Sequence, residues 1–235
     1  MNYYAMRCIV LLFLLFLILE INAQLCYPII GTYKGKSAQG MAIWRDKAYL
    51  FNECGNCRVL DLKNGIVIGY VTLGSAGKDN HVATACFGNE FPPTSNMPAI
   101  YLAEFSGKSR CFVENIKDNT SILLQTIEAK ENGKNYRIQC WLVDSESERL
   151  YSVSGKQSID SLGRCPVVIR GYRLPMLSED HNVLLTEKDK QDEFVLDFPN
   201  CLQGAVIRKG IIYLATGFQQ SQASNPRKWA FIESY

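Results

Sequence analysis

The sequence predicts an all-β protein and, within that class, a β-propeller of about four recognisable four-stranded blades. The first observation is an internal repeat, in which residues 39–51 align without a gap on residues 203–215. Two more divergent copies lie between them, at residues 81–103 and 139–153. A strand-like unit that recurs about every 40–50 residues is typical of a β-propeller.

The second observation is the spacing of one tyrosine in each copy. These tyrosines are 52, 50 and 62 residues apart: Tyr49, Tyr101, Tyr151 and Tyr213. The third observation is an independent alignment of residues 59–65 with residues 113–119, at an offset of 54. An unrelated β-sandwich would also contain many short strands, but the agreement of two registers at similar offsets favours the propeller.

Each copy begins with two strands that we expect to pair antiparallel. The first strands are predicted at residues 41–44, 82–87, 140–143 and 205–208, and the second strands at residues 48–51, 100–103, 150–153 and 212–215. Third strands follow, among them residues 167–172. Asn64-Gly65 is expected to form a type I′ turn, which needs positive φ at both central residues.

The N-terminus indicates export. Arg7 precedes an apolar run of eleven residues, 9–19, and Ala23 provides a small residue for cleavage. The run is too short to cross a bilayer, which takes about 20 residues, and the pattern is typical of a secretory signal peptide. We therefore expect a signal peptide at 1–23, a propeller domain at 24–235, a periplasmic or extracellular location, and no membrane span after cleavage.

Length and charge limit the alternatives. The 25 basic and 23 acidic residues leave a net charge of +2, without the clustered basic face that nucleic-acid binding needs. The charged run at 187–193 is interpreted as a solvated loop.

The last copy ends after a third strand near residues 228–235, so a ring closed by residues 29–33 pairing with 229–232 stays possible. A C-terminally incomplete larger propeller, with an unpaired sheet edge, is the favoured interpretation.

Eight cysteines follow the predicted signal peptide: Cys26, Cys54, Cys57, Cys86, Cys111, Cys140, Cys165 and Cys201. Eight cysteines allow 105 disulfide pairings, and sequence does not choose among them. Cys54 and Cys57 have C-x-x-C spacing, but a zinc site would need two further ligands at suitable spacing, and a redox motif of this kind opens a helix. Buried thiols are favoured, with disulfides and a metal site left open.

The candidate binding residues open the four predicted first strands: Gln39, His81, Gln139 and Gln203. In a propeller these positions converge on the mouth of a central channel, and convergent polar groups in a concavity are the default binding-site hypothesis. The alternative is that they cap strand ends by hydrogen bonding to the backbone. An enzymatic hypothesis would use His81 as a general base beside Glu90 or Glu104. No metal or other cofactor is implied.

Three segments carry a resemblance to known proteins: residues 77–81, 96–101 and 110–116. With the Gln-Gly that opens the first strands, they resemble uncharacterised exported propellers of Gram-negative gut bacteria, similar to the NHL/YVTN/gluconolactonase-like group. The resemblance implies about six blades, so that blades would be missing here. A weaker likeness, at residues 202–204 and 213–217, is to plant-type glutaminyl cyclases, although the acidic catalytic segments of that family have no counterpart.

Two classes of function follow. The first is an exported binding module for an unknown small molecule, glycan or protein, acting through the channel face. The alternative is a small-molecule enzyme of the lactonase or glutaminyl-cyclase type. Resemblance to propeller lactonases implies a cation held by acidic and amide ligands at the inner strand starts. Gln and His occupy those positions here, so the binding module is the preferred hypothesis.

Overall fold

A computed structural model describes residues 39–77, 80–105, 108–155, 161, 164–198, 201–217 and 231–234. All of them belong to one compact unit that spans residues 35–235. These described residues form seventeen β-strands and no helix, which confirms the all-β class. The described residues therefore contain no helix that is long and apolar enough to cross a membrane. The predicted signal peptide and the strand at 29–33 lie outside the described residues.

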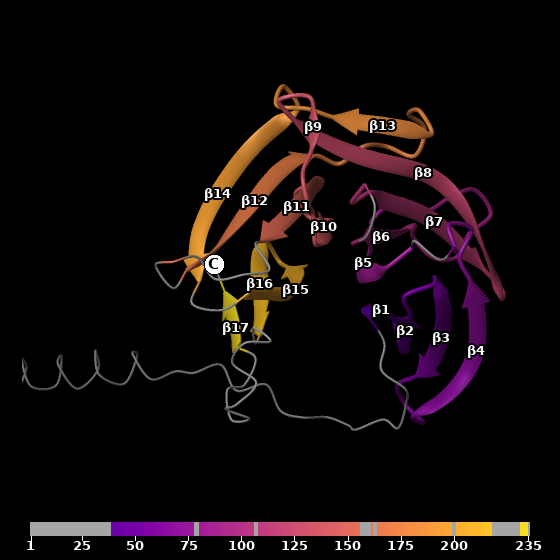
Figure 1. Cartoon of the computed structure of the whole chain (residues 1–235). Helices are drawn as coiled ribbons and strands as arrows, with labels where there is room; N and C mark the ends of the chain where they lie inside the picture. The colour runs from indigo at the N-terminus through magenta and orange to yellow at the C-terminus, as the bar shows by residue number, and fades with distance from the viewer. Residues whose placement is uncertain are drawn as a thin grey trace, which may run out of the picture. The chain divides into compact units, whose positions relative to one another are not determined.

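The strands form four consecutive antiparallel units (Figure 1). The first unit consists of β1 (Gly40–Trp44), β2 (Lys47–Phe51), β3 (Asn56–Asp61) and β4 (Ile66–Thr72). The second consists of β5 (Val82–Phe87), β6 (Ile100–Glu104), β7 (Cys111–Lys117) and β8 (Thr120–Glu131). A parallel bridge between Thr72 of β4 and Thr120 of β8 joins these two units into one sheet.

The third and fourth units are separate sheets. The third consists of β10 (Cys140–Asp144), β11 (Arg149–Gly155), β12 (Cys165–Arg173) and β14 (Lys190–Phe198). The fourth consists, among the described residues, of β15 (Cys201–Arg208), β16 (Ile211–Gly217) and β17 (Phe231–Ser234). β17 pairs antiparallel with β16, as predicted for a third strand at the end of the chain.

All four predicted pairs of first and second strands are confirmed. β1 pairs with β2, β5 with β6, β10 with β11 and β15 with β16, each antiparallel. The four tyrosines of the repeat all lie in the second strands, β2, β6, β11 and β16. The internal repeat accounts for this success, because the four copies align at the tyrosine of the second strand.

The prediction of a type I′ turn at Asn64-Gly65 is wrong. Of these two residues only Gly65 has positive φ, at 70°. The carboxylate of Asp61 accepts hydrogen bonds from the backbone N–H groups of Lys63 and Asn64, and this Asx-type contact supports a longer loop. Positive φ at both residues occurs instead at Lys209-Gly210, which joins β15 to β16.

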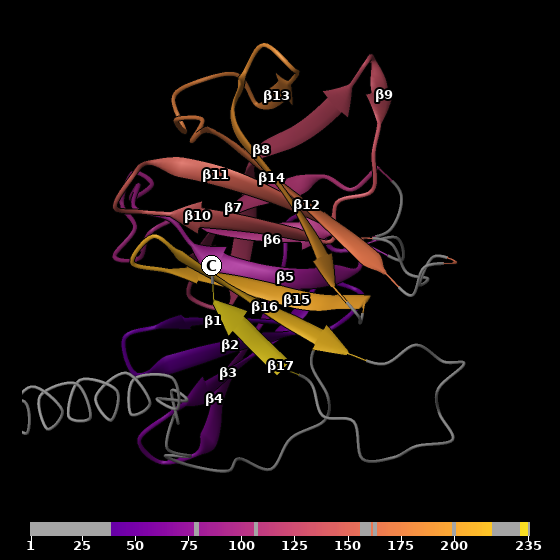
Figure 2. The same cartoon turned by 90° about the vertical axis from the view of Figure 1, so that its left-hand side faces the viewer.

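Two short or irregular elements were missed in the sequence. β13 (Asn182–Leu185) comes from the connection between β12 and β14 and pairs in parallel with the outer strand β8. β9 (Lys134–Asn135) forms a hairpin with the end of β8 (Figure 2). The interpretation of residues 187–193 as a loop is also wrong in part, because β14 begins at Lys190. Charged residues fit this strand because most of its described side chains are exposed.

Hydrophobic clusters lie where consecutive units meet. One joins the first and second units, and its fully buried members include Phe51, Val82 and Leu102. A second joins the second and third units around Tyr101 and Trp141. A third, between the third and fourth units, has these buried members: Cys140, Leu142, Val153, Val167, Ile169, Leu202, Ile212 and Leu214. The described units therefore pack face to face in chain order.

A buried carboxylate also fastens the first unit to the second. Glu114 of β7 is fully buried and accepts hydrogen bonds from the backbone N–H groups of Gly74, at 2.7 Å, and Ser75, at 2.9 Å. The Ser75 hydroxyl donates to the same carboxylate. Gly74 is required by a close approach, since a Cβ at this position would lie 2.6 Å from the backbone nitrogen of Leu123.

We expect Glu114→Gln to lower the free energy of unfolding by about 2–3 kcal/mol, because a buried charged acceptor is replaced by an amide that leaves at least one N–H group unpaired. Urea denaturation of the chain measures the loss. Glu146→Gln, at an exposed turn, is the matched control and should change stability by less than about 0.5 kcal/mol. Equal effects of the two substitutions would contradict a role for Glu114 in joining the units.

Candidate functional site

The first strands of the four units follow one another in space. β1 lies against β5, β5 against β10, and β10 against β15. Figure 1 shows these strands towards the inside of the arrangement and β4, β8 and β14 towards the outside. A hollow of about 320 Å³, here called the central hollow, opens among them. Its lining comes from all four units: Gln39, Met41, Ala83, Thr84, Ala85, Cys86, Leu142, Gln203, Gly204, Ala205, Val206, Tyr213 and Ala215.

The walls of the central hollow are mainly apolar and small. Alanine and glycine occupy five lining positions, and their short side chains leave the space open. Polar groups come from Gln39, Gln203, Thr84 and Tyr213. The amide of Gln39 also donates a hydrogen bond of 3.0 Å to Glu53. Such a cavity, apolar with a few polar groups, suits a small organic molecule.

The structure brings together two of the four predicted site residues. Gln39 and Gln203 both line the central hollow, whereas His81 and Gln139 are not among its lining residues. The His81 ring packs on Phe105, with centroids 5.6 Å apart. The buried amide of Gln139 donates to the carbonyl of Leu202 at 3.2 Å, a contact between neighbouring units. Sequence reasoning missed Ala83, Thr84 and Ala85 of β5, because small residues within a strand give no signature of a site.

The carboxylates proposed as partners of His81 are engaged elsewhere. Glu104 is buried and forms a bidentate ion pair with Arg110, at 2.7 and 2.8 Å. Glu90 accepts a hydrogen bond from the backbone N–H of Leu177 at 2.9 Å. Each group stabilises the fold by holding a protein donor, and neither is hydrogen bonded to the His81 ring in this arrangement.

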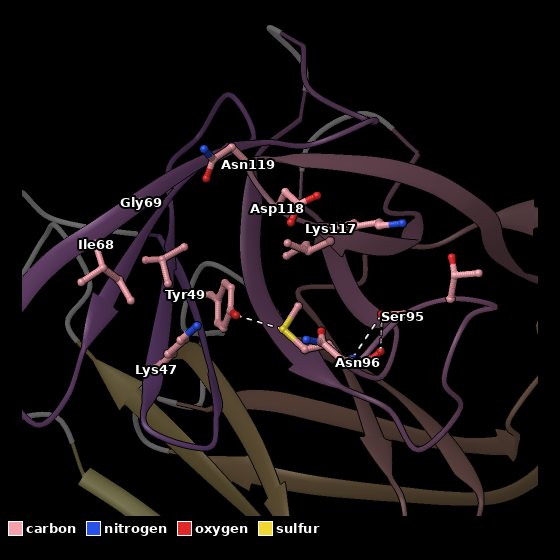
Figure 3. Close-up of a pocket in the computed structure, with 13 residues that line it drawn as sticks. Lys47, Tyr49, Ile68, Gly69, Ser95, Asn96, Lys117, Asp118 and Asn119 are labelled. Carbon is pink, nitrogen blue, oxygen red and sulfur yellow. Dashed lines mark hydrogen bonds between the residues drawn. The ribbon is translucent and has the colours of Figure 1, made fainter.

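A second hollow, of about 350 Å³, lies between the first unit and the β7–β8 turn (Figure 3). Lys47 and Tyr49 come from β2, Lys117 ends β7, and Asp118 and Asn119 form the turn. The Tyr49 hydroxyl donates to the Met97 sulfur at 2.9 Å, so its polar end is already used. The other lining residues include positively and negatively charged side chains, so this hollow is more polar than the central hollow.

The two cysteines of the C-x-x-C pair lie in different environments. Cys54 is exposed in a turn, but Cys57 lies in β3 with 1% of its surface exposed. Burial raises the pKa of the Cys57 thiol to about 12, since desolvation disfavours the thiolate. Across the residues that the structure describes, no three His, Cys, Asp or Glu side chains are grouped so as to hold a metal ion.

Comparison with known proteins gives only distant likenesses. The chain matches no protein-family model, and no curated protein aligns with it. A crystal structure of the computationally designed Ika4 protein is 9% identical, with a TM-score of 0.38 over 89% of this chain and 98% of that chain. A structure of U3-55K is 11% identical, with a TM-score of 0.39, over 81% of this chain and 50% of that chain. Similarity this low carries no argument about function.

Native protein at pH 8 should react with iodoacetamide at Cys54 and not at Cys57. A thiol with a pKa of about 12 is thiolate in only about one molecule in 10⁴ at this pH, and the thiolate is the nucleophile. Mass spectrometry of the labelled peptides locates the modification. Urea-unfolded protein, in which both residues should react, is the control. Equal labelling in the native state would restore the redox interpretation of this pair.

Proposed function

We propose that this chain is a β-propeller of four units that acts, after export, as a non-catalytic binding module for a small and largely apolar molecule. The observation that carries the proposal is the central hollow, to which the first strands of all four units contribute. Propellers place their first strands around a central channel. The apolar run before residue 23 supports export to the periplasm or the extracellular space.

Two further features support the propeller arrangement. The four main strands described for each of the first three units, and the three described for the fourth, pair antiparallel in chain order. Consecutive units share a buried apolar interface. A single barrel would have one continuous core, whereas radial sheets have one core at each interface. The β1–β5 contact belongs to this pattern, because it joins the innermost strands of neighbouring units.

The lining of the central hollow indicates the chemistry of the ligand. Met41, Leu142 and Val206 would contact an apolar body, and the burial of such surface contributes about 25 cal/mol per Å². The amides of Gln39 and Gln203 would each offer a donor and an acceptor to one or two polar groups. Among the described residues that line the central hollow, no side chain is charged, which favours a neutral ligand over an anion or a cation.

Gly204→Phe should abolish binding of N-phenyl-1-naphthylamine, a neutral dye that fluoresces in apolar surroundings. A Cβ at Gly204 would meet no atom within 4 Å, so the ring can occupy the hollow without a backbone clash. The expected loss is tenfold or more in affinity, which corresponds to about 1.4 kcal/mol. Fluorescence titration measures it, and circular dichroism verifies the fold.

Two variants serve as controls for this titration. Gly77→Phe adds the same ring at another open glycine outside the hollow. Tyr70→Ser removes an exposed aromatic side chain from β4, where the dye could bind without specificity. Both should retain the affinity of the unaltered chain. Equal binding by Gly204→Phe and Gly77→Phe would overturn the central hollow as the site, and turnover in a lactone and N-terminal glutamine substrate screen would favour the enzyme.

His81→Gln should leave dye affinity unchanged and lower the free energy of unfolding by about 0.5–1.5 kcal/mol, the typical contribution of an aromatic pair. The hypothesis from sequence expects the reverse, that binding weakens while stability is kept. We expect an effect on stability because His81 packs on Phe105 and does not line the central hollow. Fluorescence titration and urea denaturation of the same preparation distinguish the two, and weakened binding at unchanged stability would contradict our expectation.

A further inference from the structure

Two cysteines from different sheets have their sulfur atoms in contact. Cys165 opens β12 of the third unit, and Cys201 opens β15 of the fourth. Their Sγ atoms lie 3.1 Å apart, although 36 positions separate the residues in the chain. A disulfide has an S–S length of about 2.05 Å. The two sulfurs therefore need to approach by only about 1 Å, a movement within the reach of small changes in side-chain torsion.

The surroundings hold this pair in place. Cys165 is fully buried and Cys201 is 3% exposed. Next to them, Val167 and Leu202 belong to the apolar cluster between the third and fourth units. A Cβ at Gly155 would lie 3.2 Å from Leu202 and 3.5 Å from Val167, which shows how closely the two units pack here. The proximity of the sulfurs is thus set by the packing of whole strands.

We propose that Cys165 and Cys201 are an oxidative modification site and form an intramolecular disulfide that links the third unit to the fourth. This inference is independent of the proposed ligand binding. The oxidant is a small-molecule or protein disulfide, as in oxidised glutathione or a thiol oxidoreductase. One cysteine thiolate attacks that disulfide, releasing one thiol and forming a mixed disulfide. The second thiolate then attacks the bound cysteine sulfur and releases the second thiol.

The net change removes two protons and two electrons from the cysteine pair and reduces the oxidant to two thiols. Because both sulfurs are buried in the folded unit, the bond should form while the chain folds and then resist reductants. A cross-link over this interval restricts the unfolded chain and stabilises the folded one. The disulfide should stabilise the fourth unit most, because the described sheet of this unit shares a hydrophobic core with the third unit alone.

Peptide mapping of the unaltered full chain tests the pairing directly. The chain is refolded with oxidised glutathione, its remaining thiols are blocked with N-ethylmaleimide in denaturant, and the digest is analysed by mass spectrometry. We expect a peptide pair linked through Cys165 and Cys201 that disappears after reduction with dithiothreitol. Blocked thiols at both positions, or linkage of either residue to another cysteine, would overturn the proposal.

Thermal melts test the consequence. The oxidised chain should lose about 5–10 °C in Tm when it is reduced in denaturant and refolded with dithiothreitol. The double variant Cys165→Ala/Cys201→Ala should show no such difference, whereas Cys54→Ser, at an exposed position, should keep it. A redox-dependent Tm that persists in the double variant would assign the effect to other cysteines. The mapping uses the unaltered chain and decides the pairing even if the double variant does not fold.

Discussion

Packing of each unit against its neighbour in chain order is the constraint on which the described structure depends. A four-stranded antiparallel sheet with one solvated face alternates apolar and polar residues, but one strand of the second unit and one of the third do not alternate in this way. In β6 and β10, every residue is buried. Such a sheet is stable only between two neighbours. The clusters around Phe51, Trp141 and Leu142 satisfy this requirement at three successive interfaces.

Polar contacts at these interfaces fix how one unit is placed on the next. Glu114 holds the chain after β4, and Gln139 donates to the backbone of the fourth unit. In the third unit, Arg170 is 8% exposed and forms ion pairs with Glu131 and Glu193, which come from β8 and β14. A buried cation without such partners would be strongly destabilising. Hydrogen bonds and ion pairs form only at particular distances and angles, so they fix the position of one sheet relative to the next. Apolar packing alone would allow the sheets to shift past one another.

The central hollow follows from the same stacking. Sheets that meet along their inner strands enclose a space, and its size depends on the side chains at the innermost positions. Ala83, Ala85 and Ala215 are too small to fill it. The residues that create the hollow are therefore inconspicuous, while Gln39 and Gln203 provide its polar groups. A site of this kind is defined by the shape of several units together and not by a motif within one of them.

Local patterns in the sequence determined the first and second strands of each unit. They also determined the antiparallel pairing of the strands of Tyr49 and Tyr213 with their first strands, because alternation and short turns act between near neighbours. They also singled out Gln39 and Gln203, which line the central hollow. Only the tertiary structure decided the parallel pairing of β13 with β8, the position of His81 on Phe105, and the contact of Cys165 with Cys201. These contacts join segments from different units, and how the faces of those units pack is a property of the whole assembly that no single repeat encodes.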